Sequence, residues 1–459
     1  MCKVSVIMPS LNVGLYIGES IASVLCQTIK DIEIICVDAG STDGTLEILE
    51  SYVAEDKRIR LIHSDRKSYG YQMNLGISEA AGEYIGILET DDYIEPYMYE
   101  TLYDMAVSQE ADISKADFDL FTETETGERI FVPYSLARLN RVEYEKLYSC
   151  EDYIDERIKP ECYIWNAIYR RGFLHENSVR FNETPGASFQ DFSFRYMTAF
   201  FAKRIVAVKR VCYHYRRDNS EASTYHPKTV EYNLRESKYT LAQFRDRQVT
   251  DKRLYRALAN EIAEFAFWPY MELLKWGEPA ASTAAAYESY RSLFVELIDM
   301  GYAAKEGMNP DLWKDVRLLS EGTDVYLGYA RVTAEIERED VLRYLDYVED
   351  KDSVVIFGAG IRGNAIYALL RNNGEDNIKA FCDNDTAKVG TMRYGTEVIA
   401  PDEAVEKYRK ALYIISSPSM YEQARSQLYA RGIPDKQIAA YPLSVHPLFC
   451  TNRMVIRNR

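Results

Sequence analysis

Residues 85–93 read Ile-Gly-Ile-Leu-Glu-Thr-Asp-Asp-Tyr, an apolar run that ends in the carboxylates of Glu89, Asp91 and Asp92. A short apolar run is typical of a buried strand, and neighbouring carboxylates repel one another unless a cation or hydrogen-bond donors hold them. Mg²⁺ and Mn²⁺ prefer oxygen ligands, and Mg²⁺ is often bound by one or two carboxylates together with substrate phosphates. This strand end is therefore a candidate metal-diphosphate site, with a solvated acidic turn as the alternative.

The sequence around this strand alternates between two patterns. Apolar runs at 3–8, 32–38, 59–62 and 84–88 predict strands, and stretches at 15–27, from 41 onward and at 71–81 predict helices, the second with capping side chains at Ser41, Thr42 and Asp43. Such alternation indicates an α/β fold with a mainly parallel, doubly wound sheet. Because ligands of such sheets bind beyond the carboxyl ends of the strands, Asp38 and the Glu89–Asp92 strand end are predicted to face one crevice.

The remaining chain divides into two further regions. Residues 226–345 show long helical periodicity with many Glu/Arg pairs, which predicts an all-helical middle region. At 353 the alternation returns, with an apolar run at 354–357, a helix to about 371 and a strand at 378–382, which predicts a second, Rossmann-like α/β domain. The predicted divisions are 1–225, 226–345, 350–445 and a tail at 446–459.

Composition limits the classes of partner. The 459 residues carry a net charge of −16, which argues against a nonspecific grip on nucleic acid or anionic lipid. The sequence shows no leader pattern and no long apolar run for a membrane span, and its eight cysteines lack CxxC spacing. The cytoplasm is the expected location, with at most a peripheral membrane contact through the basic tail.

Four motifs follow one another in the first half of the chain: Val4-Ser-Val-Ile-Met-Pro-Ser-Leu-Asn12, Val37-Asp-Ala-Gly-Ser-Thr-Asp-Gly-Thr45, Asn74-Leu-Gly76 with Gly82-Glu-Tyr84, and Glu89-Thr-Asp-Asp92. In this order and spacing they resemble the family 2 glycosyltransferases over about the first 225 residues. The resemblance implies the GT-A fold and inverting transfer of a sugar from a nucleotide diphosphate to an acceptor hydroxyl.

The resemblance also implies roles for individual residues. Asp91 is the expected metal ligand for Mn²⁺ or Mg²⁺, with Glu89 beside it where the family more often has aspartate. Ala39 stands where the family has a second acidic residue, which leaves the nucleotide less certain, with UDP the first choice. The nucleotide-binding residues implied by the motifs are Pro9, Ser10, Asn12, Asp38, Asn74 and Asp92.

An inverting displacement needs a carboxylate to take the acceptor proton. In the family this base belongs to a Glu-Asp pair followed by x-x-Phe, and here Gln190-Asp191 precedes Phe192 and Phe194, which makes Asp191 the candidate base. The alternative is an aspartate that caps a helix. Three residues are weaker candidates on the acceptor or diphosphate side, each with a structural alternative: Trp165, Arg216 and His214.

The second α/β region carries a glycine motif that suits a dinucleotide fingerprint, formed by Gly358, Gly360 and Gly363 with Asp383 twenty residues further on. NAD(P) or another nucleotide is the candidate ligand, an assembly role is the alternative, and whether the domain binds a ligand is left open. No Tyr-x-x-x-Lys pair suggests hydride transfer, and similar modules on sugar-modifying proteins often lack redox chemistry, so a nonredox role is favoured.

These features predict a glycosyltransferase with a nucleotide-sugar donor and a glycan or lipid-linked acceptor, in bacterial surface polysaccharide synthesis. Two alternatives stay open. One is a bifunctional protein whose C-terminal domain modifies a nucleotide sugar with NAD. The other is a noncatalytic sugar-binding scaffold, marked by the departures at Ala39, Glu89 and Gln190. Assembly into a homo-oligomer is also left open.

Overall fold

The computed structural model describes residues 2–123, 127–155, 163–187, 189–219 and 226–441. The chain forms two compact units. As far as these residues are described, the first unit holds 1–118, 134–215 and 221–331, and the second holds 119–133, 216–220 and 332–459. The predicted tail at 446–459 lies outside the described residues.

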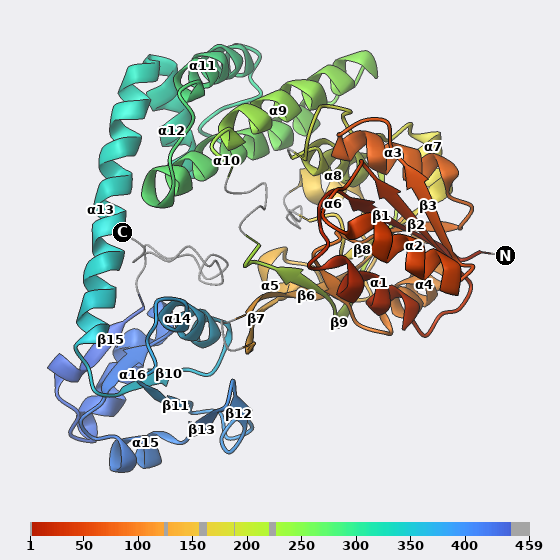
Figure 1. The fold of residues 1–459 in the computed structure, drawn as a ribbon. Coiled ribbons are helices and arrows are strands. Elements are labelled where there is room, and N and C mark those ends of the chain that lie inside the picture. Colours follow the sequence, from red (N-terminus) through yellow and green to blue (C-terminus); the bar gives the residue numbers. More distant parts are fainter. Residues whose placement is uncertain (1, 124–126, 156–162, 188, 220–225, 442–459) are drawn as a thin grey trace. The chain divides into compact units, whose positions relative to one another are not determined.

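One sheet organises the first unit, with the strand order β3-β2-β1-β4-β8-β6-β9-β5 and β7 paired to β6 (Figure 1). β1 pairs in parallel with β2 and β4, and β2 with β3, whereas β8 is antiparallel to β4 and β6. The strands are β1 (Val4–Ser10), β2 (Ile32–Asp38), β3 (Ile59–His63), β4 (Tyr84–Ile87), β5 (Tyr93–Ile94), β6 (Ile113–Glu123), β7 (Arg129–Tyr134), β8 (Ala167–Arg170) and β9 (Ile205–Arg216).

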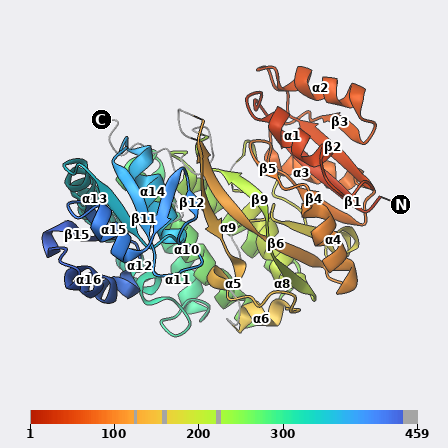
Figure 2. The ribbon, with the colours of Figure 1, turned by 90° about the horizontal axis from the view of Figure 1, so that it is seen from below.

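The parallel strands bring the candidate site residues to one edge of the sheet. β1, β2 and β3 lie side by side (Figure 2), and the register pairs Ser10 with Asp38 and Ile7 with Ile87. β1 and β4 are buried along their whole length, as expected for parallel strands that are covered on both faces. The chain therefore leaves β1, β2 and β4 at the same edge, which confirms the α/β fold predicted for this region.

Helices connect the strands of the first unit. They are α1 (Ile17–Leu25), α2 (Thr45–Glu55), α3 (Tyr69–Glu79), α4 (Met98–Ser108), α5 (Leu136–Leu139), α6 (Cys150–Ile154), α7 (Arg171–Glu176) and α8 (Asp191–Phe201). The N-cap residue of α2 is Gly44, whose φ of 97° is left-handed, so the cap position itself carries no side chain. Asp43, one of the predicted capping residues, accepts hydrogen bonds from the amide and the hydroxyl of Thr45, the first residue of α2, and from the amide of Gly14.

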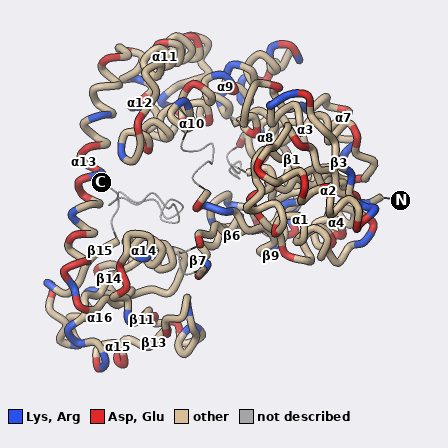
Figure 3. The backbone as a smooth tube through the Cα atoms, in the orientation of Figure 1, with Lys and Arg blue, Asp and Glu red and all other residues tan. Residues whose placement is uncertain are grey.

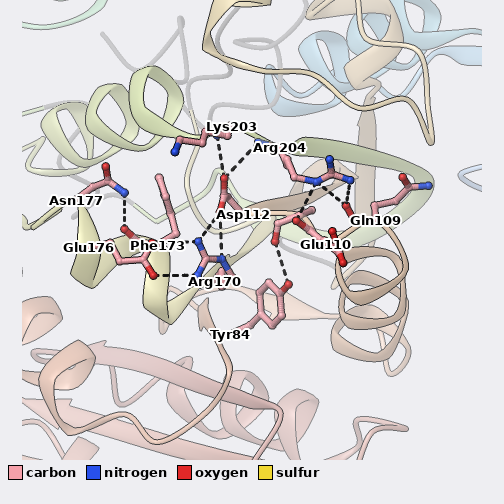
Figure 4. Close-up of polar contacts among 11 residues, drawn as sticks. Tyr84, Gln109, Glu110, Asp112, Arg170, Phe173, Glu176, Asn177, Lys203 and Arg204 are labelled. Atoms are coloured by element: carbon pink, nitrogen blue, oxygen red, sulfur yellow. Dashed lines mark hydrogen bonds and ion pairs between the residues drawn. The ribbon is translucent and has the colours of Figure 1, made fainter.

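A buried carboxylate ties together the antiparallel half of the sheet (Figure 4). Oδ1 of Asp112 accepts from the Arg170 guanidinium at 2.9 and 3.1 Å, and Oδ2 accepts from the amides of Lys203 and Arg204 at 2.9 and 3.3 Å. These contacts join β8 to the chain just before β6 and just before β9, so they hold the three antiparallel strands together.

The middle region is helical: α9 (Thr229–Asp246), α10 (Lys252–Trp276), α11 (Thr283–Asp299), α12 (Pro310–Glu321) and α13 (Thr323–Glu349). Acidic and basic residues alternate along α13 (Figure 3). The Glu/Arg pairs expected from the sequence form contacts such as Arg245–Glu296 at 2.6 Å and Arg317–Glu321 at 2.8 Å. Among the described helices, none is both long and apolar enough to cross a bilayer.

The second unit contains another sheet, ordered β12-β13-β11-β10-β14-β15. All its pairs are parallel except β12 with β13. Its elements are β10 (Val354–Phe357), α14 (Ile361–Asn372), β11 (Ile378–Cys382), β12 (Met392–Arg393), β13 (Thr396–Ile399), α15 (Pro401–Lys407), β14 (Leu412–Ile415), α16 (Tyr421–Ala430) and β15 (Ile438–Ala440). The glycine motif lies between β10 and α14, at the carboxyl end of the central strand.

Candidate active site

Asp38 organises the loop at the end of β2. Its Oδ2 accepts from the hydroxyls of Ser10 and Ser41 at 2.8 and 2.6 Å, and its Oδ1 accepts from the amides of Gly40 and Ser41, both at 2.8 Å. The side chain is 0% exposed. Both oxygens are thus engaged by the protein itself, so Asp38 shapes the loop, and a direct contact with a nucleotide would compete with these hydrogen bonds.

Two further predicted nucleotide residues lie at the same edge. The carbonyl of Pro9 accepts from the Thr90 hydroxyl at 2.8 Å, which joins β1 to the acidic turn. The exposed Asn12 has a left-handed φ of 55°, and its Oδ1 accepts from the amide of Thr42 at 2.9 Å. Gln72, which the sequence analysis did not single out, donates to the carbonyls of Ser10 and Val37 at 2.9 and 2.6 Å.

Two tyrosines hold the acidic strand end. The hydroxyl of Tyr69 donates to Oε1 of Glu89 at 2.6 Å, and the hydroxyl of Tyr213 donates to Oδ2 of Asp92 at 2.6 Å. The same Tyr213 oxygen accepts from the amide of Glu89 at 3.2 Å. Asp92 is buried and Asp91 is partly exposed, so Asp91 is the more accessible of the two for a ligand.

The strand-end carboxylates repel one another as predicted. Burial raises the pKa of Glu89 to about 8, with the charges of Asp91 and Asp191 acting in the same direction and the hydrogen bond from Tyr69 opposing them. Asp191 lies about a hundred residues further along the chain, and hydrogen bonds connect the two parts of the site. The amide of Tyr69, whose hydroxyl binds Glu89, donates to the carbonyl of Gly186 at 3.1 Å, and Nε2 of Gln190 lies 2.9 Å from the same carbonyl.

Asp191 is the first residue of α8, and Gln190 is the helix N-cap without a side-chain capping bond. Burial raises the pKa of Asp191, against the charge of Arg195 and the hydrogen bonds from the amides of Phe192 and Asp191. The residue before Gln190, Phe189, has a left-handed φ of 64°. This backbone geometry is uncommon for a bulky residue and is often found at functional sites.

The side-chain amide of Gln190 can donate hydrogen bonds that an ionised glutamate at this position could not. Its side-chain Nε2 lies within hydrogen-bond distance of the Thr184 carbonyl, the Thr184 hydroxyl and the Gly186 carbonyl, at 3.2, 3.1 and 2.9 Å. A carboxylate has no proton to donate to a carbonyl oxygen. The amide at 190 therefore fixes the loop before the base, and its departure from the family pattern has a physical reason.

Asn74 ties α3 to the segment that leads to Asp191. Its Nδ2 donates to the carbonyl of Phe181 and to Oε1 of Glu183, both at 3.0 Å, and its Oδ1 accepts from the amide of Phe181 at 3.0 Å. Both Nδ2 and Oδ1 of the Asn74 side chain thus make hydrogen bonds within the protein. The predicted contact between Asn74 and the nucleotide would have to replace them.

The three weaker candidates have protein partners. Trp165 is 4% exposed and stacks on Tyr213 with ring centroids 4.0 Å apart, which favours the structural alternative over an open sugar platform. His214 places Nε2 3.0 Å from Oε1 of Glu95. In the second unit, Arg216 pairs with Asp218 at 3.3 Å and Glu123 at 3.8 Å. The partners of His214 and Arg216 are thus carboxylates of the chain itself.

The donor set at the strand end suits a divalent cation that is completed by phosphates. Among the described residues, no group of three or more His, Cys, Asp or Glu side chains converges as a ready metal cage. Mg²⁺ does not require such a cage, since it usually takes one or two carboxylates and leaves the other positions to substrate phosphates and water. Asp91 and Glu89 fit that requirement. Burial is the main reason for the raised pKa of Glu89, and a bound cation would favour the ionised form of this carboxylate.

Backbone conformation and close packing account for two of the three glycines in the motif of the second unit. Gly358 has a φ of 109°, and a Cβ on Gly363 would lie 1.9 Å from the carbonyl oxygen of Gly358. Asp383, predicted to bind ribose, accepts from the amide of Ala359 at 2.8 Å and from Lys388 at 3.1 Å. Although burial opposes it, the hydrogen bonds from the amides of Asp385 and Ala359 hold the pKa of Asp383 below its ordinary value. Asp383 therefore fixes the glycine loop itself.

Gly363→Ala is expected to destabilise the second unit by about 1–3 kcal/mol, the range for overpacking, because the new methyl group would meet backbone. The matched control is Gly360→Ala in the same loop. Its φ is −113° and a Cβ there meets no described atom within 4 Å. Calorimetric unfolding of the full chain measures both variants. Equal transition temperatures for Gly363→Ala and Gly360→Ala would contradict the packing argument.

Two regions of the chain match different family models. Residues 5–176 match the family model described as Glycosyl transferase family 2, and residues 350–439 match the model described as C2185-like, N-terminal. Glycosyltransferase GlyG of Streptococcus pneumoniae serotype 4 is 39% identical over 123 residues, which are 27% of this chain and 41% of that protein. Uncharacterized glycosyltransferase EpsJ of Bacillus subtilis is 34% identical over 180 residues, 39% of this chain and 51% of that protein.

The chain thus spans 41% and 51% of the length of these two relatives. Among solved structures, S. aureus TarS 1–349 in complex with UDP-GlcNAc matches with a TM-score of 0.52 at 17% identity, covering 74% of this chain and 92% of that chain. At this identity the match shows the fold alone. It supports a mixed α/β, GT-A-like fold.

Proposed function

We propose that this chain, whose N-terminal region is a family 2 glycosyltransferase domain, transfers a sugar from a nucleotide-diphosphate donor to a hydroxyl of a glycan or lipid-linked acceptor. The observation that carries the proposal is the set of hydrogen bonds that joins the chain before Asp191 to the acidic strand end. The hydroxyl of Tyr69 donates to Glu89 and its amide donates to the carbonyl of Gly186, which also accepts from Gln190, the residue before Asp191. A base and a cation-binding carboxylate in one site are what an inverting displacement needs.

In the proposed reaction, the acceptor oxygen forms a bond to the anomeric carbon as the bond from that carbon to the diphosphate breaks. The hydroxyl proton passes to a carboxylate oxygen of Asp191, and the nucleoside diphosphate leaves with the electron pair. A Mn²⁺ or Mg²⁺ ion held by Asp91, with Glu89 beside it, would neutralise the charge that develops on the diphosphate. Tyr213 and Tyr69 keep Asp92 and Glu89 in place through their hydrogen bonds.

The loop residues Pro9, Ser10 and Asn12 are the proposed nucleotide contacts. Of these, Asn12 is exposed and its left-handed backbone turns the loop after β1. Asp38, Asn74 and Asp92 support the proposed pocket mainly through Ser10, Phe181 and Tyr213, to which they are hydrogen-bonded. UDP is the proposed nucleotide from the resemblance of the motifs.

We further propose that the second unit is a Rossmann-like module without redox chemistry. Its parallel sheet and the tight turn at Gly358 support this proposal, whereas the internal hydrogen bonds of Asp383 do not favour an NAD ribose contact. Bound nicotinamide in the purified protein would instead favour the bifunctional alternative. The proposed setting is cytoplasmic synthesis of a bacterial surface polysaccharide.

Donor hydrolysis tests the proposal without knowledge of the acceptor. UDP-, GDP- and dTDP-sugars, with UDP-GlcNAc among them, are incubated with Mn²⁺, Mg²⁺ or EDTA, and nucleotide release is measured. We expect release from one nucleotide class, in the presence of metal, that EDTA stops. Nucleotide binding by calorimetry with no turnover of any donor, in the presence of acceptor extracts, would favour the noncatalytic scaffold instead.

A further inference from the structure

Helix α9 carries a buried carboxyl group beside the candidate active site. Glu236 is 0% exposed, and its Oε1 accepts from Nδ2 of Asn182 at 2.9 Å and lies 3.5 Å from Nε of Arg235. Its Oε2 is buried without a hydrogen-bond partner among the described residues. A buried carboxyl group is costly unless it is paired or neutral, so this position in the middle helical region needs an explanation.

Two buried hydroxyls near Glu236 on α9 are satisfied within the helix. The hydroxyls of Ser237 and Thr240 donate to the carbonyls of Asn233 and Glu236, one turn earlier in the helix, at 2.7 and 2.9 Å. Such local bonds are ordinary for buried Ser and Thr in a helix. Glu236 differs because its described hydrogen bond goes out of the helix, to the segment that leads to Asp191.

That segment, residues 181–187, connects the two halves of the candidate site. The amide of Tyr69 donates to the carbonyl of Gly186 at 3.1 Å, and Gln190 also contacts Gly186. A Cβ on Gly70 would lie 1.9 Å from the carbonyl oxygen of Asn182, so Asn182 packs directly on the start of α3. Asn182 therefore stands between Tyr69, which binds Glu89, and the turn that presents Asp191.

We propose that Glu236 is a positioning residue of this active site, which anchors Asn182 and thereby holds the 181–187 segment between the Tyr69–Glu89 pair and Asp191. The inference rests on the proposed function, because it assigns a role relative to the proposed base. It also gives the helical region a part in the site of the N-terminal sheet, through α9.

The electrostatics of Glu236 agree with a neutral anchor. Burial raises its pKa to about 8, opposed by Arg235 and by the hydrogen bond from Asn182, with the charge of Asp191 acting in the same direction as burial. Burial and, after it, the charge of Glu236 raise the pKa of Tyr239. The raised pKa of Glu236 favours its protonated, neutral form near neutral pH.

Because Glu236 is expected to be neutral, two variants at this position should behave differently. Glu236→Gln keeps the length and an acceptor oxygen for Asn182 while it mimics the neutral acid, so at pH 7 we expect donor hydrolysis within about twofold of wild type, the limit set by a change below about 0.5 kcal/mol. Glu236→Ala removes the anchor. We expect a fall of about tenfold in kcat with an unchanged KM for the donor, because the base is misplaced while the donor pocket is kept.

A readout that needs no substrate accompanies the kinetics. Hydrogen exchange of the peptides that cover 67–72 and 181–187 is expected to accelerate in Glu236→Ala and to stay at the wild-type rate in Glu236→Gln. Glu231→Gln is the matched control on the same helix, where the carboxylate binds the Ser282 hydroxyl instead. Unchanged exchange in Glu236→Ala, or a Gln variant as impaired as the Ala variant, would overturn the inference.

The pH dependence of unfolding adds an independent test. Because the folded state holds the Glu236 proton up to about pH 8, whereas an unfolded glutamate loses it near its ordinary value of about 4.3, the stability from this group falls as the pH rises through that window. We expect the free energy of unfolding of Glu236→Gln to rise relative to that of wild type as the pH is raised from 5 to 8.5. A difference between variant and wild type that does not change with pH would contradict a neutral Glu236. Absence of donor hydrolysis in wild type would count against the proposed function alone, since exchange and unfolding are measured without donor.

Discussion

Asp191→Asn is expected to lower kcat for sugar transfer by about 10²- to 10⁴-fold, the range for loss of a general acid–base group. Asparagine has nearly the same shape and begins a helix as well as aspartate does, so α8 is expected to form as before. The amide lacks the basicity to accept the acceptor proton. Steady-state transfer kinetics measure the effect, and calorimetry is expected to show unchanged nucleotide binding.

Asp251→Asn is the control for this variant, because Asp251 caps α10 through the amide of Arg253 and pairs with the guanidinium of the same residue. It is expected to keep wild-type activity. Should Asp191→Asn retain more than a tenth of the wild-type kcat, Asp191 would be a helix-start residue and the base would have to be sought elsewhere. Retention of the anomeric configuration in the product, observed by NMR, would also demote Asp191 as the base of an inverting reaction.

The ionisation of Asp191 also predicts the acid side of the pH profile. The base works only when ionised, and burial raises its pKa above the ordinary value for aspartate. The transfer rate is therefore expected to fall, as the pH is lowered, at a higher pH than the ordinary aspartate value of about 3.9.

Asp91→Ala is expected to reduce metal-dependent donor hydrolysis by about 10²-fold, which corresponds to about 3 kcal/mol of lost charge stabilisation on the leaving diphosphate. Asp91 is the more exposed of the two adjacent aspartates, whereas the hydrogen bond from Tyr213 occupies Asp92. Initial rates across a Mn²⁺ titration measure the effect. We expect that added metal restores little of the rate, because the missing oxygen ligand belongs to the protein.

The control is Asp104→Ala, which removes an exposed carboxylate from α4 and is expected to leave the metal titration unchanged. Two results would argue against a cation at this strand end. One is a wild-type rate that EDTA does not affect, and the other is an Asp91→Ala variant with the wild-type dependence on Mn²⁺.

The departures from the family pattern have different consequences in the structure. Gln190 replaces a glutamate and gains three acceptors for its Nε2 in the loop before the base. Glu89 replaces an aspartate, and its longer side chain reaches the hydroxyl of Tyr69. Ala39 is buried, and its methyl side chain has no group that could hydrogen-bond to a nucleotide base. Gln190 and Glu89 thus each make hydrogen bonds at the candidate site. These bonds argue against the alternative of a noncatalytic scaffold.

The sequence by itself determined the order of the elements and the edge of the sheet where the site lies. Alternating apolar runs and amphipathic stretches predicted β1, β2, β3 and β4 within a few residues, because hydrophobic periodicity is a local signal. The carboxyl ends of parallel strands meet at one edge, so the placement of Asp38 and the Glu89–Asp92 turn at the same edge also followed from the pattern.

Only the tertiary structure decided how each side chain is used. Asp38, Asn74 and Asp383 proved to be hydrogen-bonded within the protein, and Trp165 stacks on Tyr213. Nothing local to Tyr69 or Glu236 marked them, because their partners Glu89 and Asn182 lie 20 and 54 residues away in the chain. An aspartate, a tryptophan or a glutamate has several possible partners, and the choice among them is made by packing between distant segments, which burial and hydrogen-bond satisfaction settle only once the chain has folded.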